Sequence, residues 1–181
     1  MRALHDLVQS GKVRYIGASS MWATQFASMQ FVAEKHGWTQ FVSMQNLYNL
    51  CYREEEREMN RFCRETGVGI IPWSPMSGGK LARPLGKETA RSSTPHPMNP
   101  PNTPADEEII RRVEKVAADK GWKMSEVALL WVRSKGAIPI VGCNSPPRVE
   151  DVIGLKGKAL TDEEVKFLEE PYVPKKVQGH F

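Results

Sequence analysis

At 181 residues, of which 40% are hydrophobic, the chain can bury the core of one domain or of part of a larger one. The net charge of +4 comes from Lys and Arg scattered among acidic residues, which argues against a nucleic-acid-binding surface. The three cysteines and four histidines have no metal-binding spacing. The apolar run 127–132 is too short to cross a membrane, and the N-terminus does not resemble a signal peptide. We therefore expect a cytoplasmic protein that binds no metal, membrane or nucleic acid.

One pattern occurs four times along the chain: an amphipathic helix, a glycine and a short apolar strand. Helices that alternate with strands at this spacing indicate parallel strands joined by right-handed crossovers. Four such units would form half of a closed eight-stranded barrel, with both sheet edges open. The predicted helix and strand pairs are 4–11 with 12–18, 24–37 with 38–44, 55–67 with 68–72, and 126–136 with 137–141.

Polar residues follow each of the four predicted strands. In parallel α/β folds the carboxyl ends of the strands carry the chemistry, so these residues should meet at one edge. They are Ser19 and Ser20, Gln45 and Asn46, Trp73 and Ser74, and Gly142 to Asn144.

The remaining segments connect these units. Residues 84–105 contain six prolines and no apolar periodicity, so they are predicted to form a long functional loop, which ends where Thr103 caps a helix. Residues 161–164 (TDEE) form a capping box for the last helix, and Ser145 is a candidate N-cap before Pro146. The acidic run 53–58 is predicted to be a solvated helix start, and His180 to lie in a surface tail.

Four motifs, GKVRYIGASS, SMQNLYNL, IIPWSPMSGGKLARP and IPIVGCNSPPRVEDVIG, together resemble the aldo-keto reductase family. The resemblance covers the whole chain and is greatest to fungal aryl-alcohol dehydrogenases and polyketide-pathway reductases. It implies a (β/α)8 barrel that binds NADP(H) at the carboxyl ends of its strands. Residues 1–181 would be its C-terminal half, an incomplete barrel of about four βα units that corresponds to strands 5–8. It also suggests a role in secondary metabolism.

The resemblance implies a role for each strand end. Without it, Trp73 is equally well explained as a core aromatic. Arg148 has a solvated helix residue as its less favoured alternative, because a positive charge is unfavourable in the first turn of a helix. Ser20 stands where the family has asparagine, and Arg148 where glutamine is common; a guanidinium at that place favours a 2′-phosphate. The implied cofactor contacts are Ser19, Ser20 and Gln45 for the nicotinamide carboxamide, Trp73 for stacking, Ser74, Pro75, Met76 and Gly78 for the pyrophosphate, Arg83 and Arg91 for the covering loop, and Gly142, Asn144, Arg148 and Asp151 for the adenosine phosphate.

No catalytic residue is assigned, because the family's catalytic Tyr, Asp, Lys and His lie in its first four strands. Tyr48 lies near the site edge, but the sequence puts no Lys or His beside it. The first hypothesis is an NADPH-dependent reductase of small carbonyl compounds, or alcohol dehydrogenase, completed by an N-terminal half or a partner subunit. The alternatives are a non-catalytic dinucleotide-binding or regulatory protein, and a fragment without function.

Overall fold

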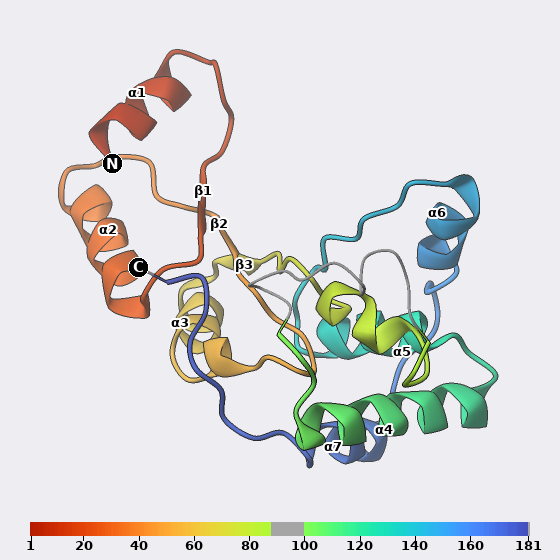
Figure 1. Ribbon diagram of the computed structural model, residues 1–181. Coiled ribbons are helices and arrows are strands. Elements are labelled where there is room, and N and C mark those ends of the chain that lie inside the picture. Colours follow the sequence, from red (N-terminus) through yellow and green to blue (C-terminus); the bar gives the residue numbers. More distant parts are fainter. Residues whose placement is uncertain (88–99, 181) are drawn as a thin grey trace.

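The computed structural model describes residues 1–87 and 100–180 (Figure 1). Helices and short parallel strands alternate over the first 70 residues, and helices predominate after that. The elements in chain order are α1 (Arg2–Gln9), β1 (Gly17–Ser19), α2 (Ala23–Lys35), β2 (Ser43–Gln45), the 3-10 helix η1 (Glu54–Glu56), α3 (Met59–Thr66), β3 (Gly69–Ile70), the 3-10 helix η2 (Ser77–Ala82), α4 (Pro104–Lys120), α5 (Met124–Ser134), α6 (Pro146–Ile153) and α7 (Asp162–Glu169).

The three strands form a parallel sheet in the order β1-β2-β3, which confirms the predicted parallel pairing. Ser19 lies opposite Gln45 in the β1–β2 pair, and Met44 lies opposite Ile70 in the β2–β3 pair. The strands are shorter than predicted, because only two or three residues of each run pair in a regular ladder. The carboxyl ends of all three point to the same edge.

The fourth predicted strand, residues 137–141, is not a regular strand. Its backbone still runs beside β3: Ile138 N–H donates to the Ile70 carbonyl, and Ile140 N–H to the Pro72 carbonyl, both at 2.9 Å. The return bond of a parallel ladder would have to come from the amide of residue 72, and proline has no N–H. Pairing is therefore one-sided, but the segment lies where the fourth strand was expected.

Helix boundaries follow the sequence signals in most places. Thr103 caps α4 and Thr161 caps α7, each by accepting a backbone N–H with its hydroxyl oxygen, as predicted. Gly67 ends α3 in the left-handed region, with φ of 74°. Ser145 does precede α6 and Pro146 does begin it, but the Ser145 side chain makes no capping hydrogen bond, so that part of the prediction was wrong.

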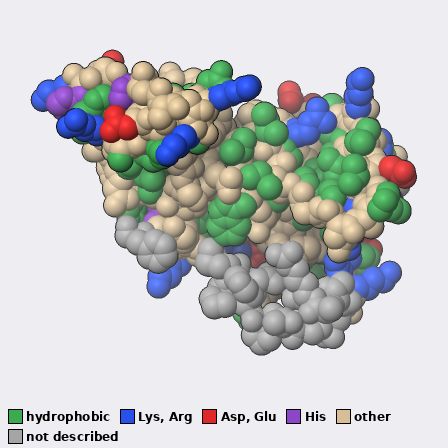
Figure 2. All heavy atoms as spheres, turned by 90° about the horizontal axis from the view of Figure 1, so that it is seen from above, with side chains coloured by type: hydrophobic (Ala, Val, Ile, Leu, Met, Phe, Trp, Pro, Cys, Tyr) green, Lys and Arg blue, Asp and Glu red, His purple; other side chains and the backbone are tan. Residues whose placement is uncertain are grey.

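The core lies on one face of the sheet. Ile16, Met44, Ile70 and Ala137 are buried there together with residues from α2, α3, α4 and α5. In residues 1–87 and 100–180 the opposite face has no such cover, and Ile138 and Ile140 are 71% and 42% exposed. Figure 2, the molecule seen from above relative to Figure 1, shows hydrophobic side chains over the middle of the surface and on the side where α6 lies. This open face corresponds to the interior of the expected barrel.

The acidic run and the C-terminal tail differ from their predictions. Glu54 and Glu55 lie in η1 and are buried, not solvated. In Figure 1 the dark-blue tail runs from α7 past α3 towards the start of α2. His180 in this tail accepts or donates a 2.7 Å hydrogen bond with Glu55 Oε1, and its side chain is mostly buried. The tail therefore covers Glu54 and Glu55, whereas Arg57 and Glu58 of the same run are exposed.

Candidate functional site

The residues predicted to bind the nicotinamide end lie side by side. Ser19 ends β1 and Gln45 ends β2, in register, and the Ser19 hydroxyl donates to the Gln45 carbonyl at 3.2 Å. Ser20 follows directly, and its Oγ is buried without a hydrogen-bond partner among the described residues. Buried hydroxyls are normally paired, so an unpaired one at this place fits a ligand group such as a carboxamide.

Trp73 lies one step further along the same edge. The backbone N–H of Trp73 donates to the backbone carbonyl of Asn46 at 2.9 Å, and Trp73 pairs with Leu47 as an isolated parallel bridge. The Trp73 side chain is half-buried, so part of it is open to a ligand. The structure therefore brings Ser19, Gln45 and Trp73 together on neighbouring strand ends.

The loop after Trp73 has an unusual backbone. Ser74 and Ser77 have φ of 52° and 49°, values that non-glycine residues rarely adopt, and Gly78 and Gly79 also have positive φ. Such turns can present backbone N–H groups to an anion. Here, however, the N–H groups of Ser77 and Gly79 donate to the Ser74 and Met76 carbonyls within the loop, both at 2.9 Å. Pro75 is buried and Met76 packs against the core, so both support the loop.

Arg83 lies against this loop. A Cβ placed on Gly79 would come within 3.3 Å of Arg83 Nη2, so the guanidinium lies over the loop backbone. That place suits contact with a bound phosphate group. Arg91 lies outside the described residues.

The predicted adenosine-phosphate residues lie beyond segment 137–141, at the start of α6. Gly142, Asn144 and Arg148 are exposed, and Arg148 stands in the first turn of α6. Asp151 is paired with Lys123 Nζ at 2.5 Å. Its carboxylate is therefore engaged by a lysine at the start of α5, whereas the other three groups are accessible.

Asn49 was missed by the sequence reasoning. It is 1% exposed, and its Nδ2 donates to the Ser74 carbonyl at 2.9 Å. The only signal was an asparagine in a short polar stretch, NLYN, between β2 and η1, where Asn commonly forms turns. Nothing local indicated a contact 25 residues away.

Three of the four tyrosines are engaged in hydrogen bonds away from the strand-end residues. Burial, and then the Glu56 carboxylate, raise the pKa of Tyr48, whose hydroxyl donates to Glu56 at 2.5 Å. Burial also raises the pKa of Tyr52 to about 12 and that of Tyr172 further. Tyr15 is 75% exposed. A raised pKa makes a tyrosine a weaker acid.

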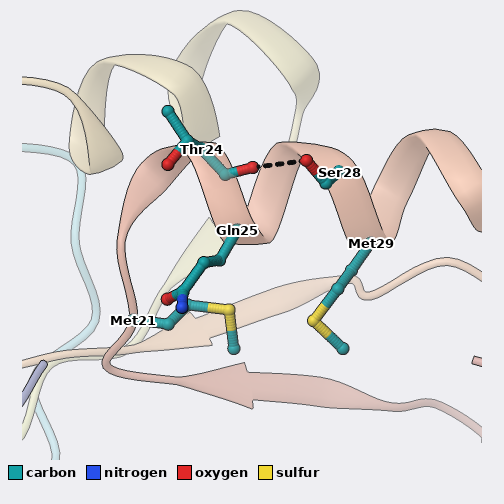
Figure 3. Close-up of a pocket in the computed structure, with 5 residues that line it drawn as sticks. All are labelled: Met21, Thr24, Gln25, Ser28 and Met29. Carbon is teal, nitrogen blue, oxygen red and sulfur yellow. Dashed lines mark hydrogen bonds between the residues drawn. The ribbon is translucent and has the colours of Figure 1, made fainter. Parts of the chain in front are cut away.

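A separate open hollow of about 580 Å³ lies on α2 (Figure 3). Figure 3 shows Met21, Gln25 and Met29 pointing from the helix region towards the strands, and Ser28 Oγ donating to the Thr24 carbonyl at 2.8 Å. None of the predicted cofactor residues lines it. In the described part of the chain, no three His, Cys, Asp or Glu side chains are arranged to hold a metal ion, and no helix has the length and apolar character needed to span a bilayer.

Proteins of similar amino-acid sequence identify the family of this chain. An aldo-keto reductase of Alternaria alternata is 51% identical over 182 residues, covering 99% of this chain and 50% of that protein. The versiconal hemiacetal acetate reductase of Aspergillus parasiticus is 46% identical over 183 residues, covering 98% of this chain and 53% of that protein. The chain thus spans about half the length of the curated relatives it matches.

A solved structure shows the same fold. The glycerol dehydrogenase of Gluconobacter oxydans superimposes with a TM-score of 0.77 at 23% identity, over 99% of this chain and 56% of that one. The family model described as aldo/keto reductase matches residues 1–172. On the family model and the relatives, the chain belongs to the aldo/keto reductase family.

Proposed function

We propose that this chain is the cofactor-binding part of an NADP(H)-dependent oxidoreductase that interconverts an aldehyde or ketone and an alcohol. The observation that carries the proposal is the meeting of Ser19, Gln45 and Trp73 on adjacent parallel strand ends. Aldo/keto reductases generally use a nicotinamide cofactor, and relatives of this chain are named as reductases. The nicotinamide, when bound, supplies or accepts the hydride.

The chain's own residues would hold and orient that cofactor. Ser20 and Gln45 offer hydroxyl and amide groups to a carboxamide, and the half-buried Trp73 offers a flat surface for stacking. The left-handed turns at Ser74 and Ser77 would shape the loop around phosphate oxygens, and Arg83, which lies over the loop backbone, would supply a positive charge. Arg148 in the first turn of α6 supports a preference for a 2′-phosphate.

The open sheet face supports the further proposal that a second set of βα units completes a barrel, either from an N-terminal half or from a partner subunit. Ile138 and Ile140 would then become buried. Reduction of a carbonyl also needs a proton donor, which those units would supply. The substrate class is a small carbonyl compound or alcohol, and the versiconal hemiacetal acetate reductase among the relatives favours a role in secondary metabolism.

A second candidate is a dinucleotide-binding protein without turnover. The raised pKa values of the buried tyrosines favour it for this chain acting alone. One experiment separates the two: the 181-residue chain is titrated with NADPH while tryptophan fluorescence is followed, and an aldehyde is then added. We expect quenching with little NADPH oxidation. Absence of binding would contradict both candidates, and steady oxidation would show that this chain needs no other units.

A further inference from the structure

Two contacts fix the backbone on either side of the Trp73 side chain. On one side, Trp73 N–H donates to the Asn46 carbonyl at 2.9 Å. On the other, the Ser74 carbonyl accepts Asn49 Nδ2 at 2.9 Å. Both partners come from the segment after β2, which therefore holds the dipeptide Trp73–Ser74 at its two ends.

Asn49 is itself held firmly. Its Oδ1 accepts Cys51 N–H at 2.9 Å, and its backbone pairs with Tyr52 in both directions, at 3.1 and 3.0 Å. The residue is 1% exposed, so its amide has no water to bond instead. With its side-chain oxygen and backbone engaged, Asn49 contributes its amide N–H to the Ser74 carbonyl.

Ser74 needs such support. Its φ of 52° lies in the left-handed region, which is unfavourable for any residue with a Cβ. Its carbonyl also accepts Ser77 N–H at 2.9 Å, which closes the first turn of the loop. An additional hydrogen bond to the same oxygen stabilises this turn against the extended alternative.

We propose that Asn49 is a positioning residue for the loop that follows Trp73, called the cofactor loop below. The side-chain amide of Asn49 holds Ser74 in the left-handed conformation. It thereby sets the direction of the Trp73 ring and of the loop N–H groups. This inference rests on the proposed function for its effect on the cofactor. Its effect on the loop can be measured without one.

The test compares three variants of the 181-residue chain. Asn49→Ala removes the amide, and Ser74→Gly removes the Cβ that makes the left-handed turn unfavourable. Gln30→Ala is the matched control, because Gln30 is also a buried amide and bonds the backbone of Phe41 on the opposite, amino-terminal side of β2. Hydrogen exchange of the peptide covering 73–82 and NADPH affinity are measured for each variant and for the double variant Asn49→Ala/Ser74→Gly.

Asn49→Ala removes the side-chain hydrogen bonds to Ser74 and to Cys51 N–H, of which only the first reaches the loop. We expect this variant to speed exchange in 73–82 and to weaken NADPH binding about fivefold, the effect of losing that one hydrogen bond. The double variant should bind within about twofold of Ser74→Gly alone, since glycine adopts this turn without help. Gln30→Ala should lower the melting temperature but leave both readouts unchanged. Unaltered exchange in Asn49→Ala, or a loss that Ser74→Gly does not repair, would overturn the inference. If the unmodified chain does not bind NADPH, the proposed function fails, and exchange alone still decides the role of Asn49 in the loop.

Discussion

The hydroxyl of Tyr172 joins the C-terminal tail to the buried segment after β2. It donates to Glu54 Oε1 at 2.6 Å and accepts Arg53 N–H at 2.9 Å. The Glu54 side chain is 3% exposed and also accepts Lys175 N–H at 2.7 Å. Tyr172→Phe removes this hydroxyl without creating a cavity, so its effect measures these two hydrogen bonds.

The expected cost follows from the two bonds. A hydrogen bond to a charged group is worth about 1.5–3 kcal/mol, and an unpaired, partly buried N–H costs about 1 kcal/mol more. The free energy of unfolding should therefore fall by about 2–4 kcal/mol. In a chain of this size this corresponds to a decrease in Tm of roughly 5–15 °C.

The dependence on pH gives a second measure. Burial by itself would raise the pKa of Glu54, but hydrogen bonds from Tyr172, the Lys175 backbone and Arg57 outweigh it, and the pKa is lowered from 4.5. A lowered pKa contributes stability above the ordinary value of 4.5, and this contribution is lost as the pH falls through the folded-state pKa. The difference between the unmodified chain and Tyr172→Phe should therefore be largest near neutral pH and decrease below about pH 4.

Urea unfolding at several pH values measures both effects. Tyr15→Phe is the control, because Tyr15 is 75% exposed and the same atom is removed there. Equal stability of Tyr172→Phe and Tyr15→Phe at pH 7 would refute the assigned role of the tail hydroxyl.

Three further outcomes are expected. Trp73→Ala should weaken NADPH binding several-fold, since aromatic stacking is worth about 0.5–1.5 kcal/mol beyond burial. The control Trp38→Ala, on the amino-terminal side of β2, should not weaken it, and equal affinities of the two variants by fluorescence titration would contradict the stacking role. Lys175→Met should lower the free energy of unfolding, measured in urea, by about 3 kcal/mol, because it leaves the buried Asp106 carboxylate without its cation. Adding Asp106→Asn should recover part of this loss, and no change in either variant would show that the pair is dispensable. Arg148→Gln should reduce the ratio of NADPH to NADH affinity about tenfold, the effect of losing one charge-assisted contact, and an unchanged ratio would exclude Arg148 from 2′-phosphate recognition.

The repeating part of the fold could be predicted from the sequence because its signals are local. Apolar periodicity, Gly67 at a helix end and the caps at Thr103 and Thr161 each act within a few residues. The shared edge of Ser19 and Gln45 followed from parallel pairing alone. These inferences needed no knowledge of distant contacts.

The errors came from contacts between distant residues. The acidic run was predicted to be solvated, but Glu54 and Glu55 are covered by tail residues more than 115 positions away. Burial raises the pKa of Glu55, and this outweighs the lowering by His180. The fourth strand lost its regular ladder to a proline in the neighbouring segment, Pro72, not to its own residues. Asn49 was missed for the same reason, since its partner Ser74 lies 25 residues away.

These distant contacts connect the tail with the candidate site. The Tyr172 hydroxyl donates a hydrogen bond to Glu54. The segment that contains Glu54 begins at the turn formed by Asn49, whose side-chain amide donates to the Ser74 carbonyl in the cofactor loop. Lys175 extends the connection to Asp106, in the first turn of α4. Because packed segments transmit strain, loosening the tail should also loosen the loop. Tyr172→Phe, which touches no predicted cofactor contact, should therefore speed hydrogen exchange in 73–82, whereas Tyr15→Phe should not. If Tyr172→Phe lowers stability but leaves exchange in this loop unchanged, the tail stabilises the fold without acting on the site.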